Sequence, residues 1–170
     1  TDLREHIDEY IFGTDDQSLE QVVGEELRQR RLTLALAESC TGGATTAKLT
    51  DVPGSSAYLI GSVVCYDNRI KTDWVGVSSE TLLQHGAVSS ETAIAMAKGI
   101  RDRFAADIGI GITGIAGPDG GNEAKPVGLV YLAVAGPHGV IVEEEHFAGQ
   151  RSAIRNRAVN SSLDLLRRYL

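Results

Sequence analysis

The sequence predicts a three-layer α/β/α protein with a mixed, mostly parallel sheet. Short apolar segments alternate with amphipathic segments along most of the chain, a pattern typical of parallel strands joined by covering helices. Two further strand-like segments, 128–136 and 139–147, flank a short turn near the end of the chain. They predict a β-hairpin, which adds antiparallel pairing to the sheet.

The individual elements follow from apolar spacing and from capping residues. Ser18 is expected to cap a helix that ends at Arg30, and Ser78 and Ser89 are expected to cap later helices. The remaining predicted elements are a strand at 32–37, a helix at 43–50, a strand at 58–66, helical turns within 67–85, a helix at 91–104, a strand from 106 that leads into a glycine-rich loop, and a helix at 151–170.

Composition restricts the class of protein. Residues 18–170 are interpreted as one domain, and the polar, turn-rich residues 1–17 as an N-terminal linker. The net charge of −7 argues against a nucleic-acid-binding protein. No signal peptide and no apolar run of about 18 residues is found, which predicts a cytoplasmic protein that does not bind a membrane. Cys40 and Cys65 lack metal or disulfide spacing and are interpreted as reduced, buried thiols.

Residues 109–114 match the glycine pattern GxGxxG of dinucleotide-binding proteins. That pattern requires a strand-to-helix turn, whereas these glycines lie within an apolar strand and the loop that follows cannot begin a helix. We therefore interpret them as positions where another backbone or a ligand approaches the sheet closely.

The segment LALAESCTGG, residues 34–43, has the strand, turn and helix order that the previous motif lacks. The free N–H groups of Thr41, Gly42 and Gly43 could hold a phosphate or a developing oxyanion. The alternative is a turn capped by Thr41 or Ser39. Because neighbouring side chains of an extended chain point to opposite faces, only one of Ser39 and Cys40 can readily face a cleft.

A nucleophilic serine needs a base, and none of the four histidines lies in a recognisable triad context. Lys71 and Lys125 are the lysine candidates. A lysine acts as a base when burial or a neighbouring cation lowers its pKa, and Arg69 is a candidate for that cation. Tyr66 could relay a proton or could be a solvated strand-end residue.

Two more segments have functional features. The loop 113–128 contains Asp119 and Glu123, whose spacing does not suit a metal site, and loops of this length are usually functional. Arg151 and Arg155 lie one helical turn apart. They form either a solvated basic face or a clamp for a phosphate or carboxamide.

The order of these motifs resembles one family, the C-terminal domain of CinA, the competence/damage-inducible proteins, over about residues 18–170. The motifs that carry the resemblance are AESCTGG (37–43), VPGSS (52–56), YDNRIK (66–71), GAVSSE (86–91), TGIAGPDGG (113–121), KPVG (125–128) and GQR (149–151). The leading segment also resembles the junction that precedes this domain in two-domain CinA proteins. Together with the start at Thr1, it suggests an excised fragment whose upstream partner would be a molybdopterin-binding-type domain.

The resemblance implies an α/β/α fold of the anticodon-binding-domain-like type, a homodimer, and no metal or other cofactor. It implies nicotinamide-nucleotide amidase activity, in which the carboxamide of nicotinamide mononucleotide is hydrolysed to nicotinate mononucleotide and ammonia. Ser39 aligns with the nucleophile and Lys71 with its base, and Tyr66 lies beside them. The ligand-lining positions implied by the resemblance are Gly42, Gly43, Thr113, Gly114 and Arg151.

The chain departs from the family pattern at three positions. The usual YSNEAK is YDNRIK, which introduces Asp67 and Arg69, and the usual GDR is GQR, which introduces Gln150. An alternative function is therefore a catalytically weakened nucleotide-binding regulatory module. A third interpretation makes Cys40 the nucleophile, but no histidine is placed to activate a thiol.

Overall fold

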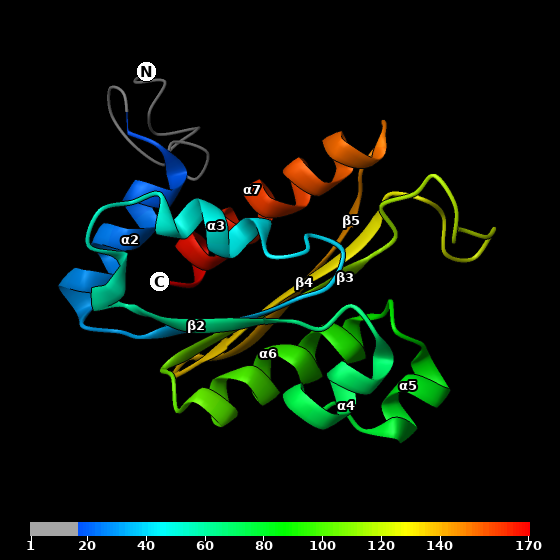
Figure 1. The fold of residues 1–170 in the computed structure, drawn as a ribbon, viewed down its shortest axis with the longest axis horizontal. Coiled ribbons are helices and arrows are strands. Elements are labelled where there is room, and N and C mark those ends of the chain that lie inside the picture. Colours follow the sequence, from blue (N-terminus) through cyan, green and yellow to red (C-terminus); the bar gives the residue numbers. More distant parts are fainter. Residues whose placement is uncertain (1–16) are drawn as a thin grey trace, which may run out of the picture.

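The computed structural model describes residues 17–170, so the linker expected over residues 1–17 lies outside the described residues except for its last position. The predicted α/β/α architecture is confirmed. A five-stranded sheet lies between helices α2, α3 and α7 on one face and helices α4, α5 and α6 on the other (Figure 1). The helices are α2 (Leu19–Arg30), α3 (Ala44–Thr50), α4 (Asn68–Val75), α5 (Ser79–His85), α6 (Ser90–Phe104) and α7 (Arg151–Tyr169), with a 3₁₀ turn at Ser55–Ala57.

The strands are β1 (Leu34–Glu38), β2 (Leu59–Val64), β3 (Ile108–Gly114), β4 (Leu129–Gly136) and β5 (Gly139–His146), and their order in the sheet is β2-β1-β3-β4-β5. β1 pairs in parallel with β2 and β3, whereas β4 pairs antiparallel with β3 and β5. All strands except β4 therefore share one direction. The mixed, mostly parallel sheet and the hairpin of the sequence prediction are both confirmed.

The predicted helix caps are confirmed where serine precedes a helix. Ser78 and Ser89 accept hydrogen bonds from the N–H groups of Thr81 and Thr92. The N–H of Ser18 donates to the side chain of Gln21 at 2.9 Å, as in a capping box.

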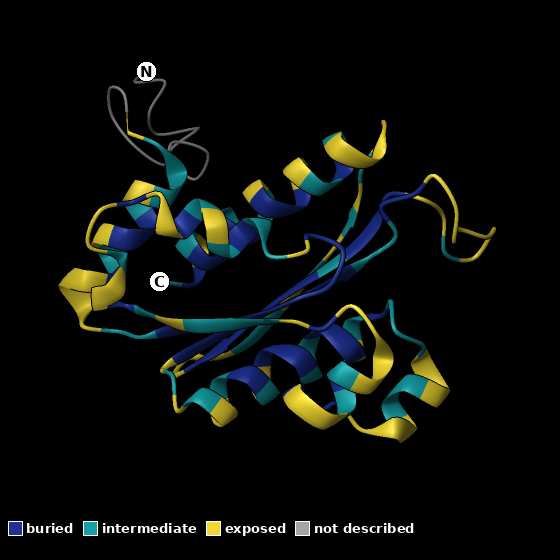
Figure 2. Ribbon diagram, in the orientation of Figure 1, coloured by how far each residue is buried: buried dark blue, intermediate teal, exposed yellow. Residues whose placement is uncertain are grey.

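The two faces of the sheet pack in different ways (Figure 2). One face presents large aliphatic residues such as Leu36 and Ile110 to α2, α3 and α7. The other face presents alanines and glycines, and α6 therefore lies close against it. A Cβ atom on Gly109 would lie 2.0 Å from the carbonyl oxygen of Ala97, and one on Gly111 would lie 2.2 Å from that of Ala93. Gly109 and Gly111 of the GxGxxG match thus admit the α6 backbone, in agreement with their interpretation as positions of close backbone approach.

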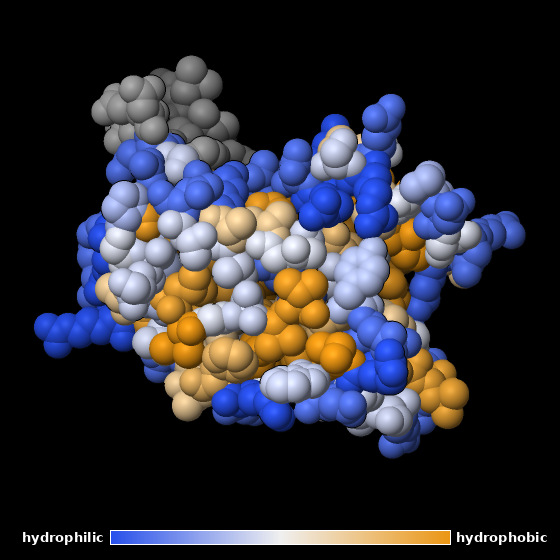
Figure 3. Space-filling model, viewed as in Figure 1, coloured by the Kyte–Doolittle hydropathy of each residue, from blue (hydrophilic) through white to orange (hydrophobic). Residues whose placement is uncertain are grey.

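The edge strand β2 exposes Ile60 and Val64, and Figure 3 shows apolar residues gathered along this edge. An exposed apolar edge strand favours pairing with another chain, and the expected homodimer stays a prediction. Within residues 17–170, no helix combines the length and the apolar composition that crossing a membrane requires.

Candidate active site

The site forms where the carboxyl ends of β1, β2 and β3 meet. Glu38, the last residue of β1, is in register with Val64 of β2 and Ile112 of β3. The backbone continues this alignment, because the N–H of Ser39 donates to the carbonyl of Ile112 at 2.9 Å and the N–H of Cys65 donates to the carbonyl of Glu38 at 2.8 Å. After β1 the chain crosses to β2, which is the neighbour of β1 on one side, whereas β3 is its neighbour on the other side. Open α/β sheets bind ligands at such points.

A pocket of about 270 Å³ opens at this edge. Its lining contains most of the sequence-predicted site residues, together with segments from the loop after β3 and from the turn between α5 and α6. The lining residues are Ser39, Cys40, Tyr66, Asn68, Lys71, Ala87, Val88, Thr113, Gly114, Ile115, Ala116, Gly117, Asp119, Gly120 and Arg151. The predicted residues Thr41, Gly42 and Gly43 lie beside the pocket and are not part of that lining.

Ser39 and Lys71 contact each other at the floor of the pocket. Lys71 comes from α4, is 1% exposed, and places its Nζ 3.3 Å from the Oγ of Ser39. The same Nζ donates to the carbonyl oxygen of Cys65 at 2.7 Å and to that of Tyr66 at 3.4 Å. These carbonyls fix the amine, so it stays within hydrogen-bond reach of the serine. The pair has the separation that a nucleophile and its general base require.

Burial lowers the pKa of Lys71 below its ordinary value of 10.5, because the charged ammonium loses its hydration. The neighbouring cation considered in the sequence analysis is not the cause. Arg69 is 84% exposed and pairs with Asp67 at 3.1 Å, which directs its charge to the surface. A lowered pKa raises the fraction of neutral amine near neutral pH, and only the neutral amine can accept the proton of Ser39.

Cys40, the neighbour of Ser39, is a poor candidate nucleophile. It is 5% exposed and packs in the apolar cluster formed by α2, α3 and α7. Burial raises the pKa of its thiol to about 12, so almost no thiolate forms at neutral pH. The structure therefore favours Ser39 over Cys40, although both residues contribute to the pocket wall.

The turn after Ser39 already holds an anion, the carboxylate of Glu38. One carboxylate oxygen accepts from the Thr41 hydroxyl at 2.7 Å and from the N–H groups of Gly43 and Thr45 at 3.0 and 3.1 Å. The other oxygen accepts from the N–H and the hydroxyl of Thr46 at 2.8 and 2.6 Å. Glu38 is completely buried, and sequence reasoning gave it no role.

This arrangement occupies two of the N–H groups of the expected anion site at Thr41, Gly42 and Gly43. The N–H of Gly43 is bonded to Glu38, and the N–H of Gly42 donates to the carbonyl of Ser39 at 3.1 Å. The expected cap residue also differs, since α3 begins after Gly43, whose φ of 91° lies in the left-handed region. The N–H groups of Gly42 and Gly43 thus serve the turn and the internal carboxylate, and the expected ligand role of Thr41, Gly42 and Gly43 stays a prediction.

Arg151 connects three walls of the pocket. It is the first residue of α7, and its guanidinium donates to the carbonyl of Gly117 at 2.7 Å and to the Tyr66 hydroxyl at 3.0 Å. Arg155, one turn later, instead donates to the carbonyls of Cys40 and Thr41 at 3.1 and 2.7 Å. Of the two arginines, Arg151 reaches the pocket, whereas Arg155 supports the turn behind Ser39.

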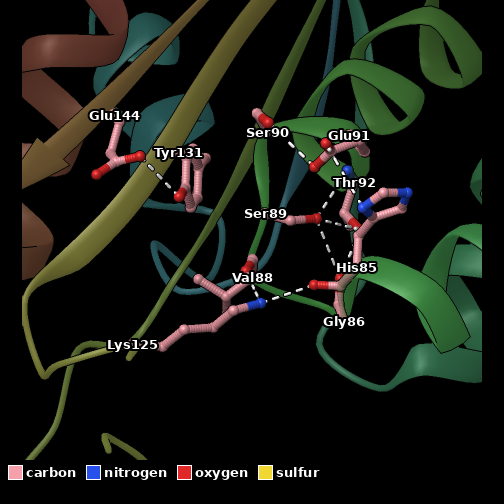
Figure 4. A network of polar contacts seen from close by, with 10 residues as sticks. All are labelled: His85, Gly86, Val88, Ser89, Ser90, Glu91, Thr92, Lys125, Tyr131 and Glu144. Atoms are coloured by element: carbon pink, nitrogen blue, oxygen red, sulfur yellow. Dashed lines mark hydrogen bonds and ion pairs between the residues drawn. The ribbon is translucent and has the colours of Figure 1, made fainter. Parts of the chain in front are cut away.

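Thr113 and Lys125 join the pocket to the turn between α5 and α6. The Thr113 hydroxyl donates to the carbonyl of Ala87 at 2.6 Å, and the Nζ of Lys125 donates to the carbonyls of His85 and Val88 at 2.7 and 2.6 Å (Figure 4). The amine of Lys125 is thus hydrogen-bonded to two carbonyls, and the residue does not line the pocket. Of the two lysines considered as a base, only Lys71 contacts the serine.

Sequence reasoning assigned no site role to Asn68, and Asp119 entered only as part of a metal alternative. Both residues line the pocket. Asn68 begins α4, and its position next to Tyr66 was the available signal. Among residues 17–170, no group of three or more His, Cys, Asp or Glu side chains is placed to share a metal ion.

The departures from the family pattern lie outside the pocket lining. Asp67 caps α4 by accepting from the N–H of Arg69 at 2.8 Å, and both side chains are exposed. Gln150 occupies the cap position of α7 without a side-chain cap bond. These substitutions therefore change helix ends and surface charge, and the Ser39–Lys71 pair is preserved.

Fold and pocket together define an α/β protein with a serine–lysine pair at the carboxyl ends of parallel strands. Comparison with known proteins supplies the family. Residues 16–170 match the CinA family, described as the CinA C-terminal domain. A competence-damage inducible protein of Moorella thermoacetica is 53% identical over 168 residues, and one of Desulforamulus reducens is 49% identical over the same length. The chain belongs to the CinA C-terminal domain family.

These two alignments cover 99% of this chain but 41% of each relative, so the chain spans about two fifths of the length of the curated relatives it matches. Solved structures agree on the fold. The competence/damage inducible protein CihA of Agrobacterium tumefaciens is 40% identical, with a TM-score of 0.86, and covers 92% of this chain and 96% of its own. The competence damage-inducible protein ComA of Klebsiella pneumoniae is 33% identical, with a TM-score of 0.85, and covers 88% and 93%.

Proposed function

We propose that this protein is an amidohydrolase that converts nicotinamide mononucleotide to nicotinate mononucleotide and ammonia. The contact between the buried amine of Lys71 and the hydroxyl of Ser39 carries the proposal. A hydroxyl with an adjacent low-pKa amine is an activated nucleophile, which is suited to attack on an amide carbonyl. The choice of substrate rests on the resemblance of the motifs to nicotinamide-nucleotide amidases.

The chemistry proceeds in two steps. Ser39 Oγ attacks the carboxamide carbon while neutral Lys71 accepts the hydroxyl proton. The tetrahedral intermediate then expels ammonia, which takes that proton from Lys71, and an ester of Ser39 remains. A water molecule, deprotonated by Lys71, attacks this ester. The C–O bond to Ser39 breaks, and Lys71 returns the proton to the serine. The carboxylic acid that forms loses its proton to solvent, and the nucleotide leaves as a carboxylate.

Arg151 is the proposed anchor for the phosphate of the nucleotide. Its guanidinium has five N–H donors, and the two bonds to Gly117 and Tyr66 leave others for an anionic ligand. Because the N–H groups of Gly42 and Gly43 are bonded within the turn, the site favours a phosphate on Arg151 over one on the turn. Tyr66 and Asn68 line the same pocket and supply further polar contacts for the substrate.

The decisive test uses the two neighbouring candidate nucleophiles as a matched pair. Purified wild-type protein incubated with nicotinamide mononucleotide should release ammonia and nicotinate mononucleotide. Ser39→Ala should lower kcat by at least a thousandfold, whereas Cys40→Ala should keep activity within about threefold of wild type. Full activity in Ser39→Ala would remove the serine from the mechanism. Nucleotide binding without ammonia release in the wild type would instead indicate the regulatory module.

A further inference from the structure

One wall of the pocket is built from the loop 115–128 between β3 and β4. That loop contributes Ile115 to Gly117, Asp119 and Gly120 to the lining, and the turn between α5 and α6 contributes Ala87 and Val88. The two segments belong to different elements, so their relative position needs contacts that join them. Figure 4 shows that Lys125 supplies such contacts.

Lys125 spans from the loop to the turn with two short hydrogen bonds. Its Nζ donates to the carbonyl of His85 at 2.7 Å and to that of Val88 at 2.6 Å. Hydrogen bonds from a charged donor are stronger than those between neutral groups. The bond to Val88 lies at a pocket-lining residue, so the ammonium of Lys125 acts directly on that wall.

The lysine is itself held on the loop side. Its backbone N–H donates to the Oδ1 of Asn122 at 2.8 Å, and the N–H of Asn122 donates to the carbonyl of Lys125 at 2.9 Å. Residues 122–125 therefore form a closed turn. Because this turn is closed, the hydrogen bonds of the Lys125 ammonium restrain the loop as well as the lysine side chain.

The turn between α5 and α6, which accepts the hydrogen bonds of Lys125, is itself held by other hydrogen bonds. The hydroxyl of Thr92 donates to the carbonyl of Gly86 at 2.7 Å, and Ser89 donates to the same oxygen at 3.2 Å. The hydroxyl of Thr113, on β3, donates to the carbonyl of Ala87 at 2.6 Å. The neighbouring carbonyls of this turn are thus held by α6, by β3 and by the loop lysine.

We propose that Lys125 is a positioning residue of the pocket, whose ammonium fastens the loop 115–128 to the turn between α5 and α6 and so sets the affinity for the substrate. The kinetic part of this inference rests on the proposed amidase function. Lys125 does not contact the Ser39–Lys71 pair, so the chemical step should depend on it weakly. Arg151 anchors the loop separately at Gly117, and Lys125 adds an anchor in its distal half.

The test compares Lys125→Met, which keeps an apolar stem without the charge, with Lys125→Arg, whose guanidinium can still donate to two carbonyls. Lys125→Met should raise KM for nicotinamide mononucleotide at least tenfold and change kcat less than threefold. Lys125→Arg should keep KM within about threefold of wild type. Two matched controls, Glu123→Ala in the same loop and Lys98→Ala on the exposed face of α6, should leave both constants unchanged.

A second measurement does not depend on catalysis. Hydrogen exchange of the free protein should be faster in Lys125→Met for peptides covering 115–128 and 86–89, and unchanged for β4. Equal exchange in the variant and the wild type, an unchanged KM, or a loss confined to kcat would each overturn the proposal. If the wild type releases no ammonia, the amidase function fails, and the exchange rates alone then decide whether Lys125 holds the wall.

Discussion

Replacing Glu38 by glutamine tests whether the turn after Ser39 is held by a buried carboxylate. The substitution conserves volume and removes the charge. In the native protein every hydrogen bond to this side chain is donated by its surroundings, from three backbone N–H groups and two threonine hydroxyls. A glutamine amide must place an NH₂ group where one of the two acceptor oxygens now lies.

The magnitude follows from counting the donors that lose an acceptor. On one side the NH₂ group would face the N–H groups of Gly43 and Thr45, and on the other side it would face the N–H of Thr46. The second orientation is less unfavourable, because it leaves one backbone N–H without an acceptor instead of two. The threonine hydroxyl on either side can rotate to accept, which a backbone N–H cannot do. One unsatisfied backbone donor costs about 1–3 kcal/mol, and loss of charge assistance weakens the remaining bonds by about 1 kcal/mol each.

We therefore expect Glu38→Gln to lower the free energy of unfolding by about 4–6 kcal/mol, which corresponds to a fall in Tm of about 8–24 °C for a domain of this size. Urea unfolding followed by circular dichroism at pH 7 measures the change. The matched control is Glu80→Gln on the exposed surface of α5, for which we expect a change within about 0.5 kcal/mol. A Glu38→Gln protein as stable as this control would refute the assignment of Glu38 as the anion of the turn.

Two further predictions concern Lys71 and the cap of α7. Because burial lowers the pKa of Lys71, kcat/KM should rise with pH as the amine becomes neutral and should level off below pH 10.5. Lys71→Arg should be inactive at every pH. A rise in kcat/KM that continues beyond pH 10.5 would contradict the burial argument. The unfolded chain binds this proton more tightly than the folded protein, so between the lowered pKa and 10.5 the wild type should gain stability relative to Lys71→Met by up to about 1.4 kcal/mol per pH unit, measured by urea unfolding. Gln150 has the extended backbone of a cap residue and no side-chain cap bond. Gln150→Asp should therefore stabilise the protein by about 1 kcal/mol, whereas Gln150→Ala should be neutral. A thermal melt in which the aspartate variant is no more stable than the wild type would contradict this expectation.

The fold was predictable because local signals and the sheet pattern agree. Serine caps precede α5 and α6, and the hairpin turn lies between two strand-like segments, so these elements could be read from the sequence. The pairing order of the strands could not be read in the same way. It is set by contacts between elements that are far apart in the sequence, and the close packing of α6 against Gly109 and Gly111 is one of them.

The candidate nucleophile and base were also predictable as residue types, but the distance between them was not. The sequence offered Lys71 and Lys125 as bases, and only the path of α4 brings one of them to Ser39. The cause of the lowered pKa was likewise beyond sequence reasoning. It comes from burial of Lys71, whereas the nearby charge of Arg69 points to the surface.

The roles of neighbouring residues in ESCTGG follow from the alternation of side chains along an extended chain. Ala37 packs on the face of the sheet covered by α4 and α6, and Ser39, two residues later, meets Lys71 from α4 on that same side. Glu38 and Cys40 point to the opposite face, where Glu38 binds the start of α3 and Cys40 joins the apolar core. Glu38 and Ser39 therefore lie on opposite faces of the sheet, and their side chains cannot act on the same group. The turn is stabilised from one face of the sheet, and the Ser39–Lys71 contact lies on the other, so a substitution at Glu38 should disturb stability before it disturbs the protonation of Lys71.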